Sequence, residues 1–152
     1  MEVTAKMVRD LRDMTGAGMM DCKKALAETD GDMEKAIEFL RKKGLAAAEK
    51  KAGRIAAEGI VDINISEDRK VASIVEVNSE TDFVAKNEKF REYVAAVAAQ
   101  AAKSSANTLE EFLDEKWEQD TTMTVKEKLA SMIAIIGENM NIRRFERIVE
   151  NN

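Results

Sequence analysis

The sequence predicts an α+β fold, in which a bundle of three helices precedes a three-stranded antiparallel sheet with helices packed on one face. In the first third of the chain, apolar residues recur every three or four positions, which is the period of a helix. From about residue 58 the spacing becomes two, which is the period of a strand with one wet face. The chain contains no proline, so glycines and polar clusters mark the ends of its elements.

The first helix is predicted over residues 3–14. Its apolar side chains follow one stripe because they are four, four and three positions apart (Val3, Met7, Leu11 and Met14). Thr4 is a suitable N-cap, since its hydroxyl can accept from an unpaired backbone N–H of the first turn. A glycine turn at residues 16–18 should end the helix, because glycine adopts the left-handed conformation without a Cβ clash.

Two further helices complete the predicted bundle. One covers residues 20–28, and the other begins at its cap, Asp32, and stops at Gly44. Three short helices with tight turns suggest a ubiquitin-associated-like module over residues 1–44. The alanine- and lysine-rich residues 45–57 should form a helical linker to the second domain.

The predicted sheet occupies the second domain, residues 58–152. Residues 61–65 alternate apolar and polar side chains, and a polar turn joins them to a second strand over residues 71–77. The second strand is apolar on both faces, which predicts a central strand covered on both sides. Residues 140–149 read as the third strand, although Arg143-Arg144 interrupts its alternation. This pair could be an exposed strand face or could form ion pairs with the acidic second half.

Three helices are expected around this sheet. One follows the segment of residues 81–87 and continues to about Lys103, and a short one covers residues 109–117, with Trp117 as a local packing anchor. The last begins at a capping box formed by Thr124 and Glu127, since each side chain can accept from the other residue's backbone N–H. Gly137 should stop it.

The charge distribution favours a protein partner. The net charge is −5, with 24 basic and 29 acidic side chains. Residues 1–56 carry 12 basic and 10 acidic groups, and residues 57–152 carry 12 and 19. An acidic second half binds phosphate backbones poorly, which argues against direct nucleic-acid binding. No apolar run is long enough to cross a bilayer, so no membrane role is expected.

The residue types exclude several kinds of active site. The chain has no histidine and one cysteine, which removes Ser–His and Cys–His dyads, imidazole metal sites and thiolate zinc sites. We therefore expect no cofactor and no metal. A single cysteine cannot form an internal disulfide, which fits the cytoplasm or an organelle matrix. Cys22 lies on an inward stripe and should be buried.

Two apolar features remain open on the residues alone. Phe83 stands beside a carboxylate, just after an apolar run and just before a helical pattern. Aromatic residues near a helix start more often pack beneath the helix than wait exposed for a partner. Met19 and Met20 either fill the small helical core or form an exposed contact pair. Adjacent helical residues cannot both face inward, so at least one methionine should be exposed.

Three segments of the chain resemble motifs of elongation factor Ts, the exchange factor for the GTPase EF-Tu. The first is Thr81-Asp82-Phe83-Val84-Ala85-Lys86-Asn87. The second is Leu11-Arg12 followed by Thr15-Gly16-Ala17-Gly18-Met19-Met20-Asp21-Cys22-Lys23-Lys24-Ala25-Leu26, and the third is Ile136-Gly137-Glu138-Asn139-Met140-Asn141-Ile142-Arg143-Arg144. They occur in the family's order and span nearly the whole chain.

The resemblance implies a function in protein biosynthesis that is not enzymatic. A member of this family binds EF-Tu·GDP in the cytoplasm and promotes guanine-nucleotide exchange by displacing the elements that hold Mg²⁺ and phosphate. By resemblance, one set of residues enters the GTPase domain of EF-Tu (Thr81, Asp82, Phe83 and Val84). A second set docks on a surface helix of the GTPase (Arg12, Met19 and Met20).

The usual bacterial family member is longer than this chain. By resemblance, the chain corresponds to the N-terminal module plus one core (dimerisation-type) subdomain, either as part of a longer protein or as a natural short form. Exchange activity could then depend on the second core subdomain and the C-terminal module. A homodimer is also expected to be compatible with this sequence, since an exposed sheet edge can pair with another chain.

Two other classes of function compete with this interpretation. In one, the three-helix bundle binds a different protein and the sheet is a scaffold, in which case Phe83 would be dispensable. In the other, carboxylates or lysines form an enzyme active site, which would need a deep polar pocket in the α+β half.

Overall fold

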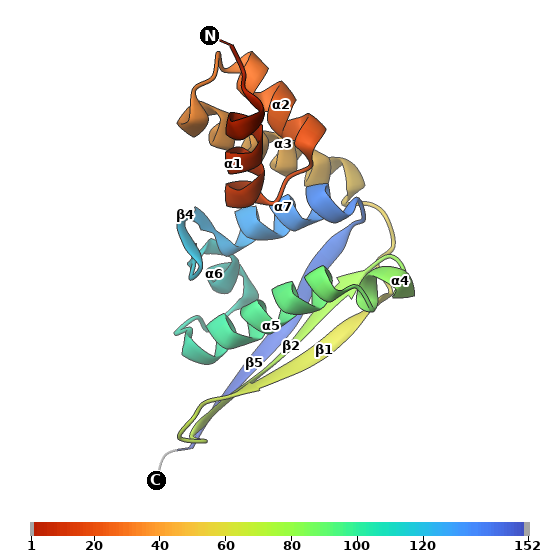
Figure 1. Cartoon of the computed structure of the whole chain (residues 1–152). Coiled ribbons are helices and arrows are strands. Elements are labelled where there is room, and N and C mark those ends of the chain that lie inside the picture. Colours follow the sequence, from red (N-terminus) through yellow and green to blue (C-terminus); the bar gives the residue numbers. More distant parts are fainter. Residues whose placement is uncertain (1, 151–152) are drawn as a thin grey trace. The chain divides into compact units, whose positions relative to one another are not determined.

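The computed structural model describes residues 2–150, which form two compact units (Figure 1). Residues 2–51 and 130–137 make up the first unit, and residues 52–129 and 138–150 make up the second. The first contains three N-terminal helices, and the second contains a three-stranded antiparallel sheet with packed helices. The predicted α+β fold is therefore confirmed.

Local hydrogen bonds set the helix ends of the first unit as predicted. Its helices are α1 (Ala5–Thr15), α2 (Met19–Glu28) and α3 (Met33–Lys51). The Thr4 hydroxyl accepts from the Met7 backbone N–H at 3.2 Å, and Gly16 ends α1 with a φ of 73°. The Asp32 carboxylate caps α3 by accepting from the Lys35 N–H at 3.1 Å. The buried core comprises Val8, Leu11, Cys22, Ala25, Leu26 and Ala36.

The prediction that the third helix stops at Gly44 is wrong. Helix α3 continues through Gly44 to Lys51, and residues 52–57 form a turn and irregular chain. Gly44 is buried, and a Cβ there would lie 3.5 Å from the Ser131 Cα. That distance is an ordinary van der Waals contact. Packing of the helix against this second backbone outweighs the low helix propensity of glycine. The predicted domain boundaries at residues 44 and 57 stay a prediction.

The sheet of the second unit contains β1 (Glu58–Ile65), β2 (Val71–Ser79) and β5 (Met140–Val149) in the order β1-β2-β5. Both pairings are antiparallel, and the predicted hairpin of the first two strands is confirmed. Helix α5 (Glu88–Lys103) crosses one face (Figure 1). The Ser73 hydroxyl of β2 donates to the Ala98 carbonyl of α5 at 2.6 Å, and the core between them includes Val75, Val77, Phe90, Val94 and Val97.

Strand β2 is central, as predicted, but it is covered on one face only. Ile74 alternates with buried Ser73 and Val75 and is 37% exposed. Ile63 lies beside Ile74 in the neighbouring strand. The expectation of cover on both sides fails within the second unit, because α5 packs on one face and side chains of the other face are exposed. We call the opposite side the open sheet face; its exposed apolar residues are Val61, Ile63, Ile65, Ile74 and Ile148.

A register shift in the last strand explains why Arg143-Arg144 breaks the alternation. Glu76 pairs with Arg144 and Val77 pairs with Ile142, which leaves Arg143 as an extra residue in β5. The Arg144 Nε lies 3.0 Å from a Glu76 carboxylate oxygen, and the Arg143 Nε lies 3.9 Å from the other. The Asn78 amide hydrogen bond and these two guanidinium groups hold the pKa of Glu76 below its ordinary value.

The prediction of a helix over residues 109–117 is wrong at its C-terminal end. Helix α6 (Leu109–Asp114) stops early, and Trp117 lies in β3 (Lys116–Trp117), which pairs with β4 (Asp120–Thr124). The Gln100 side chain of α5 holds this hairpin, donating to the Lys116 carbonyl at 2.9 Å and accepting from the Glu118 N–H at 2.8 Å. Trp117 is 2% exposed, so its prediction as a packing anchor is confirmed.

Helix α7 (Val125–Ile136) begins and ends as predicted. The Glu127 carboxylate accepts from the Thr124 N–H at 2.9 Å, and the Thr124 hydroxyl accepts from the Glu127 N–H at 3.1 Å. Gly137 follows the helix with a φ of 86°, a left-handed conformation that glycine adopts readily. This turn delivers Glu138 directly to the candidate site.

Candidate functional site

The segment Thr81–Asn87 lies between the end of β2 and the start of α5. Its middle is a single helical turn, α4 (Asp82–Ala85). The Thr81 hydroxyl caps this turn by accepting from the Val84 N–H at 3.3 Å. Asn87 in turn caps α5 by accepting from the Phe90 N–H at 3.1 Å. The helix expected after residues 81–87 is therefore confirmed as α5 (Glu88–Lys103), and the segment before it forms a separate capped turn.

The helical turn presents Phe83 to solvent. Ala85 is buried, and Phe83, two positions earlier, lies about 200° around the helix axis from it. The Phe83 side chain is 83% exposed. Asp82 beside it is also exposed, and its carboxylate lies 3.8 Å from the Lys86 ammonium. The interpretation in which Phe83 packs beneath its own helix is wrong.

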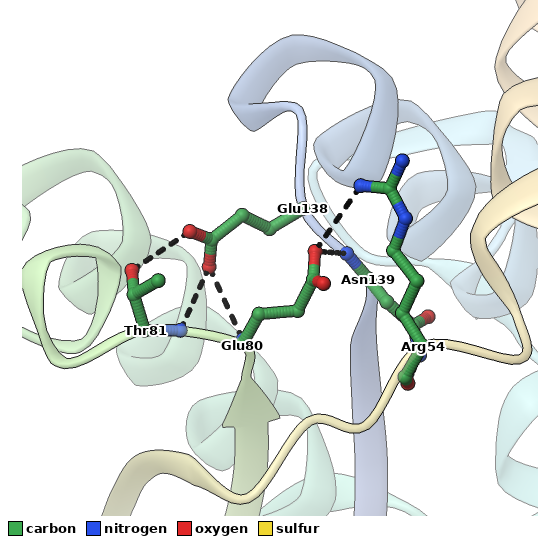
Figure 2. A network of polar contacts seen from close by, with 5 residues as sticks. All are labelled: Arg54, Glu80, Thr81, Glu138 and Asn139. Carbon is green, nitrogen blue, oxygen red and sulfur yellow. Dashed lines mark hydrogen bonds and ion pairs between the residues drawn. The ribbon is translucent and has the colours of Figure 1, made fainter.

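A polar network holds the base of this turn (Figure 2). Its five residues come from three separate parts of the second unit: Arg54, Glu80, Thr81, Glu138 and Asn139. The Glu138 carboxylate accepts from the backbone N–H groups of Glu80 and Thr81, each at 3.1 Å, and from the Thr81 hydroxyl at 2.7 Å.

The Glu80 side chain binds back to the segment that carries Glu138. Its carboxylate accepts from the Asn139 N–H at 2.8 Å and lies 3.6 Å from the Arg54 guanidinium. The Asn139 amide donates to the Arg54 carbonyl at 2.7 Å. Sequence reasoning assigned no role to Arg54, Glu80, Glu138 or Asn139. The one signal available was that Glu138-Asn139 belongs to the third family motif.

The candidate docking residues lie on the first unit, whereas residues 81–84 lie on the second. Arg12 is exposed in the last turn of α1. Met19 and Met20 open α2 and are 47% and 78% exposed, so the prediction that at least one is exposed is confirmed. The same helix buries Cys22 completely, and burial raises the pKa of its thiol.

Residues 2–150 contain neither a cluster suited to a metal ion nor a helix suited to a membrane. No cluster of three or more carboxylate, thiol or imidazole side chains in this range is arranged to hold a metal ion. None of the helices in this range combines the length and the apolar character needed to cross a bilayer.

Comparison with known proteins relates the chain to elongation factor Ts. A family model described as "Elongation factor TS" matches residues 80–152. Elongation factor Ts of Clostridium novyi (strain NT) is 63% identical over 150 residues, which cover 99% of this chain and 49% of that protein. Over nearly its whole length, the chain is similar to elongation factor Ts at about 60% identity. Elongation factor Ts of Clostridium tetani (strain Massachusetts / E88) is 59% identical over 150 residues, or 98% of this chain and 49% of that protein.

The chain thus spans about half the length of the curated elongation factor Ts relatives that it matches. The family model covers the segment Thr81–Asn87 and the turn that carries Glu138. It therefore includes most of the polar network, whereas Arg54 and the docking candidates of the first unit lie outside it.

Proposed function

We propose that this chain binds EF-Tu·GDP and promotes release of GDP during translation elongation. The similarity to elongation factor Ts over nearly the whole chain supports the partner. The observation that carries the mechanism is Phe83, whose ring is 83% exposed on a one-turn helix held by the polar network. On this proposal the chain makes and breaks no covalent bond, acts in the cytoplasm, and needs neither nucleic acid nor a membrane.

The mechanism is displacement of the elements that bind Mg²⁺ and the β-phosphate. Mg²⁺ requires near-octahedral coordination and tolerates little movement of its ligands. Asp82 and Phe83 enter the GTPase domain, flanked by Thr81 and Val84, and the ring shifts those ligands as it becomes buried. Burial of one Phe ring contributes about 1.5–3 kcal/mol, which matches the usual coupling between two binding sites of ~1–3 kcal/mol.

Docking is assigned to the exposed residues at the α1–α2 end of the first unit. Met19 and Met20 supply soft, adaptable apolar contacts, and Arg12 supplies a charge beside them. Contacts that form equally with and without bound GDP raise affinity without accelerating release. The docking residues should therefore set the concentration at which the chain acts, and Phe83 should set the maximal rate.

The test is release of a fluorescent GDP analogue from EF-Tu at increasing concentrations of this chain. Phe83→Ala is expected to lower the maximal release rate roughly tenfold to a hundredfold, because it removes the energy of ring burial. Met20→Ala should raise the half-saturating concentration and leave the plateau rate unchanged.

Val149→Ala is the matched control for loss of an exposed apolar side chain. Val149 is 49% exposed and pairs with Val71, at the opposite end of β2 from Thr81, roughly 30 Å away along the strand. Its release curve should match that of the wild type. If wild-type chain binds EF-Tu without accelerating release, or Phe83→Ala has no effect, the proposed mechanism is wrong.

We also propose that two copies of the chain associate through the open sheet face. Val61, Ile63 and Ile65 lie on edge strand β1 and are each about 60% exposed. Burying such a surface against a second copy is favourable, and an apolar sheet face is a common dimer contact.

A change of charge on the open sheet face tests this association. Sedimentation equilibrium of the wild type should give a dimer at micromolar concentrations. Ile63→Asp should give a monomer with an unchanged circular dichroism spectrum, since a carboxylate on that face cannot be buried without a partner. A monomeric wild type at the highest concentration measured would contradict the proposal.

A further inference from the structure

The turn that presents Phe83 is too short to define its own geometry. Helix α4 has four residues, and a single helical turn fixes many dihedral angles for very few hydrogen bonds. Its conformation therefore depends on bonds from outside the turn. The Glu138 carboxylate supplies three of them, to the N–H groups of Glu80 and Thr81 and to the Thr81 hydroxyl.

The Thr81 hydroxyl transmits the effect of Glu138 into the helix. It donates to the Glu138 Oε2 at 2.7 Å and accepts from the Val84 N–H at 3.3 Å. The hydroxyl proton is therefore committed to Glu138, which leaves the oxygen lone pairs for the cap. Hydrogen bonds to an ionised acceptor are shorter and stronger than those between neutral groups.

Reciprocal bonds fix the two segments against each other (Figure 2). The Glu80 N–H donates to Glu138, and the Asn139 N–H donates to Glu80 at 2.8 Å. These segments are 58 residues apart in the sequence. The sheet does not need this arrangement for its register, because β2 and β5 already pair as far as Ser79 and Met140. The network acts on the residues just beyond that pair, where Phe83 is presented.

We infer that Glu138 is a positioning residue that holds the Asp82–Phe83 turn in the orientation in which it enters the partner. The effect of Glu138 on GDP release rests on the proposed function, whereas its hydrogen bonds to the turn do not. A contact group that is already ordered in the free protein loses less entropy on binding, so more of its binding energy remains. Glu138 acts through Thr81 and touches neither nucleotide nor Mg²⁺.

A double-mutant cycle separates positioning from a general structural effect. Glu138→Gln keeps the side-chain size but replaces the ionised acceptor that takes the Thr81 hydroxyl proton. We expect the maximal GDP release rate to fall roughly tenfold, the usual effect of losing a charge-assisted hydrogen bond. In the Phe83→Ala background the same substitution should cause no further loss. Losses that multiply in the double mutant would overturn the inference.

Threonine variants test the same bond from its other side. Thr81→Val removes the hydroxyl at nearly constant volume and should reproduce the loss seen with Glu138→Gln. Thr81→Ser keeps the hydroxyl and should recover most of the GDP release rate that Thr81→Val loses. A Thr81→Ser variant as slow as Thr81→Val would count against the hydroxyl relay.

Glu127→Gln is the matched control for loss of a capping carboxylate. Glu127 also accepts a backbone N–H, from Thr124 at 2.9 Å, but it lies at the start of α7 and outside the polar network. We expect no change in the GDP release rate. An equal loss in this variant would show that any weakened cap slows release.

A measurement on the free chain distinguishes failure of this inference from failure of the proposed function. In Glu138→Gln, amide hydrogen exchange at Glu80, Thr81 and Val84 should become at least tenfold faster, and exchange at Val77 within β2 should not change. Unchanged exchange at all three amides, or equally faster exchange throughout β2, would overturn the inference. If the wild-type chain does not accelerate GDP release, the proposed function is wrong. The amide exchange result would then still decide whether Glu138 orders the turn.

Discussion

Gly59→Ala is expected to unfold the second unit at a much lower urea concentration than the wild type requires. An added Cβ would lie 2.2 Å from the Val77 carbonyl oxygen and 2.7 Å from the Asn78 Cα, both of them backbone atoms of the neighbouring strand. Gly59 also has a φ of 136°, which L-residues rarely adopt. The clash and the strain act together, so we expect a loss of about 3 kcal/mol or more.

Trp117 fluorescence is the measurement for this variant. It is the only tryptophan of the chain and is 2% exposed in the second unit, so its emission reports unfolding there. Gly53→Ala is the matched control, because a Cβ at Gly53 would meet nothing within 4 Å. Its urea midpoint should stay close to that of the wild type or rise slightly. Equal midpoints for Gly59→Ala and the wild type would contradict the predicted clash.

Leu26→Ala is expected to unfold the first unit selectively. Leu26 is fully buried in a cluster that contains six buried apolar residues among those that the structure describes. Removing a buried leucine side chain typically costs about 2–5 kcal/mol, since the site collapses only in part. A core of this size contributes little to the free energy of unfolding. The loss is therefore a large fraction of the total stability of the unit.

Two optical probes should separate in the Leu26→Ala variant. The helical circular dichroism signal should begin to fall at a lower urea concentration, whereas the Trp117 fluorescence midpoint should change little because Trp117 reports the second unit. Leu45→Ala is the control, since Leu45 is 38% exposed on α3 and its loss should cost under ~1 kcal/mol. If both probes shift together by the same amount, the two units unfold as one.

The candidate site was only partly accessible from the sequence. The segment Thr81–Asn87 and the exposed methionines were found because their residue types are unusual at those positions and resemble family motifs. The outward orientation of Phe83 was not, since the residues alone favoured packing beneath the helix. The orientation of Phe83 depends on which side of the single turn is buried, and Ala85 lies on that buried side. The sheet and α5, which pack behind the turn, decide which side this is.

The sequence by itself determined the features that depend on interactions between residues a few positions apart. Thr4 caps α1, Thr124 and Glu127 cap each other, and Gly137 ends α7, all as predicted. Period-two alternation likewise located β1, because a strand with one buried face must alternate. Such features need no knowledge of where the rest of the chain lies.

Only the tertiary structure decided the features that depend on distant backbone. Helix α3 passes through Gly44 because Ser131 packs against it, and Trp117 joins a short hairpin that Gln100 holds. Glu138 reaches Thr81 from 57 residues away. In each case the deciding atoms belong to another part of the chain. Local propensity and hydrophobic periodicity do not indicate which distant residues will come into contact.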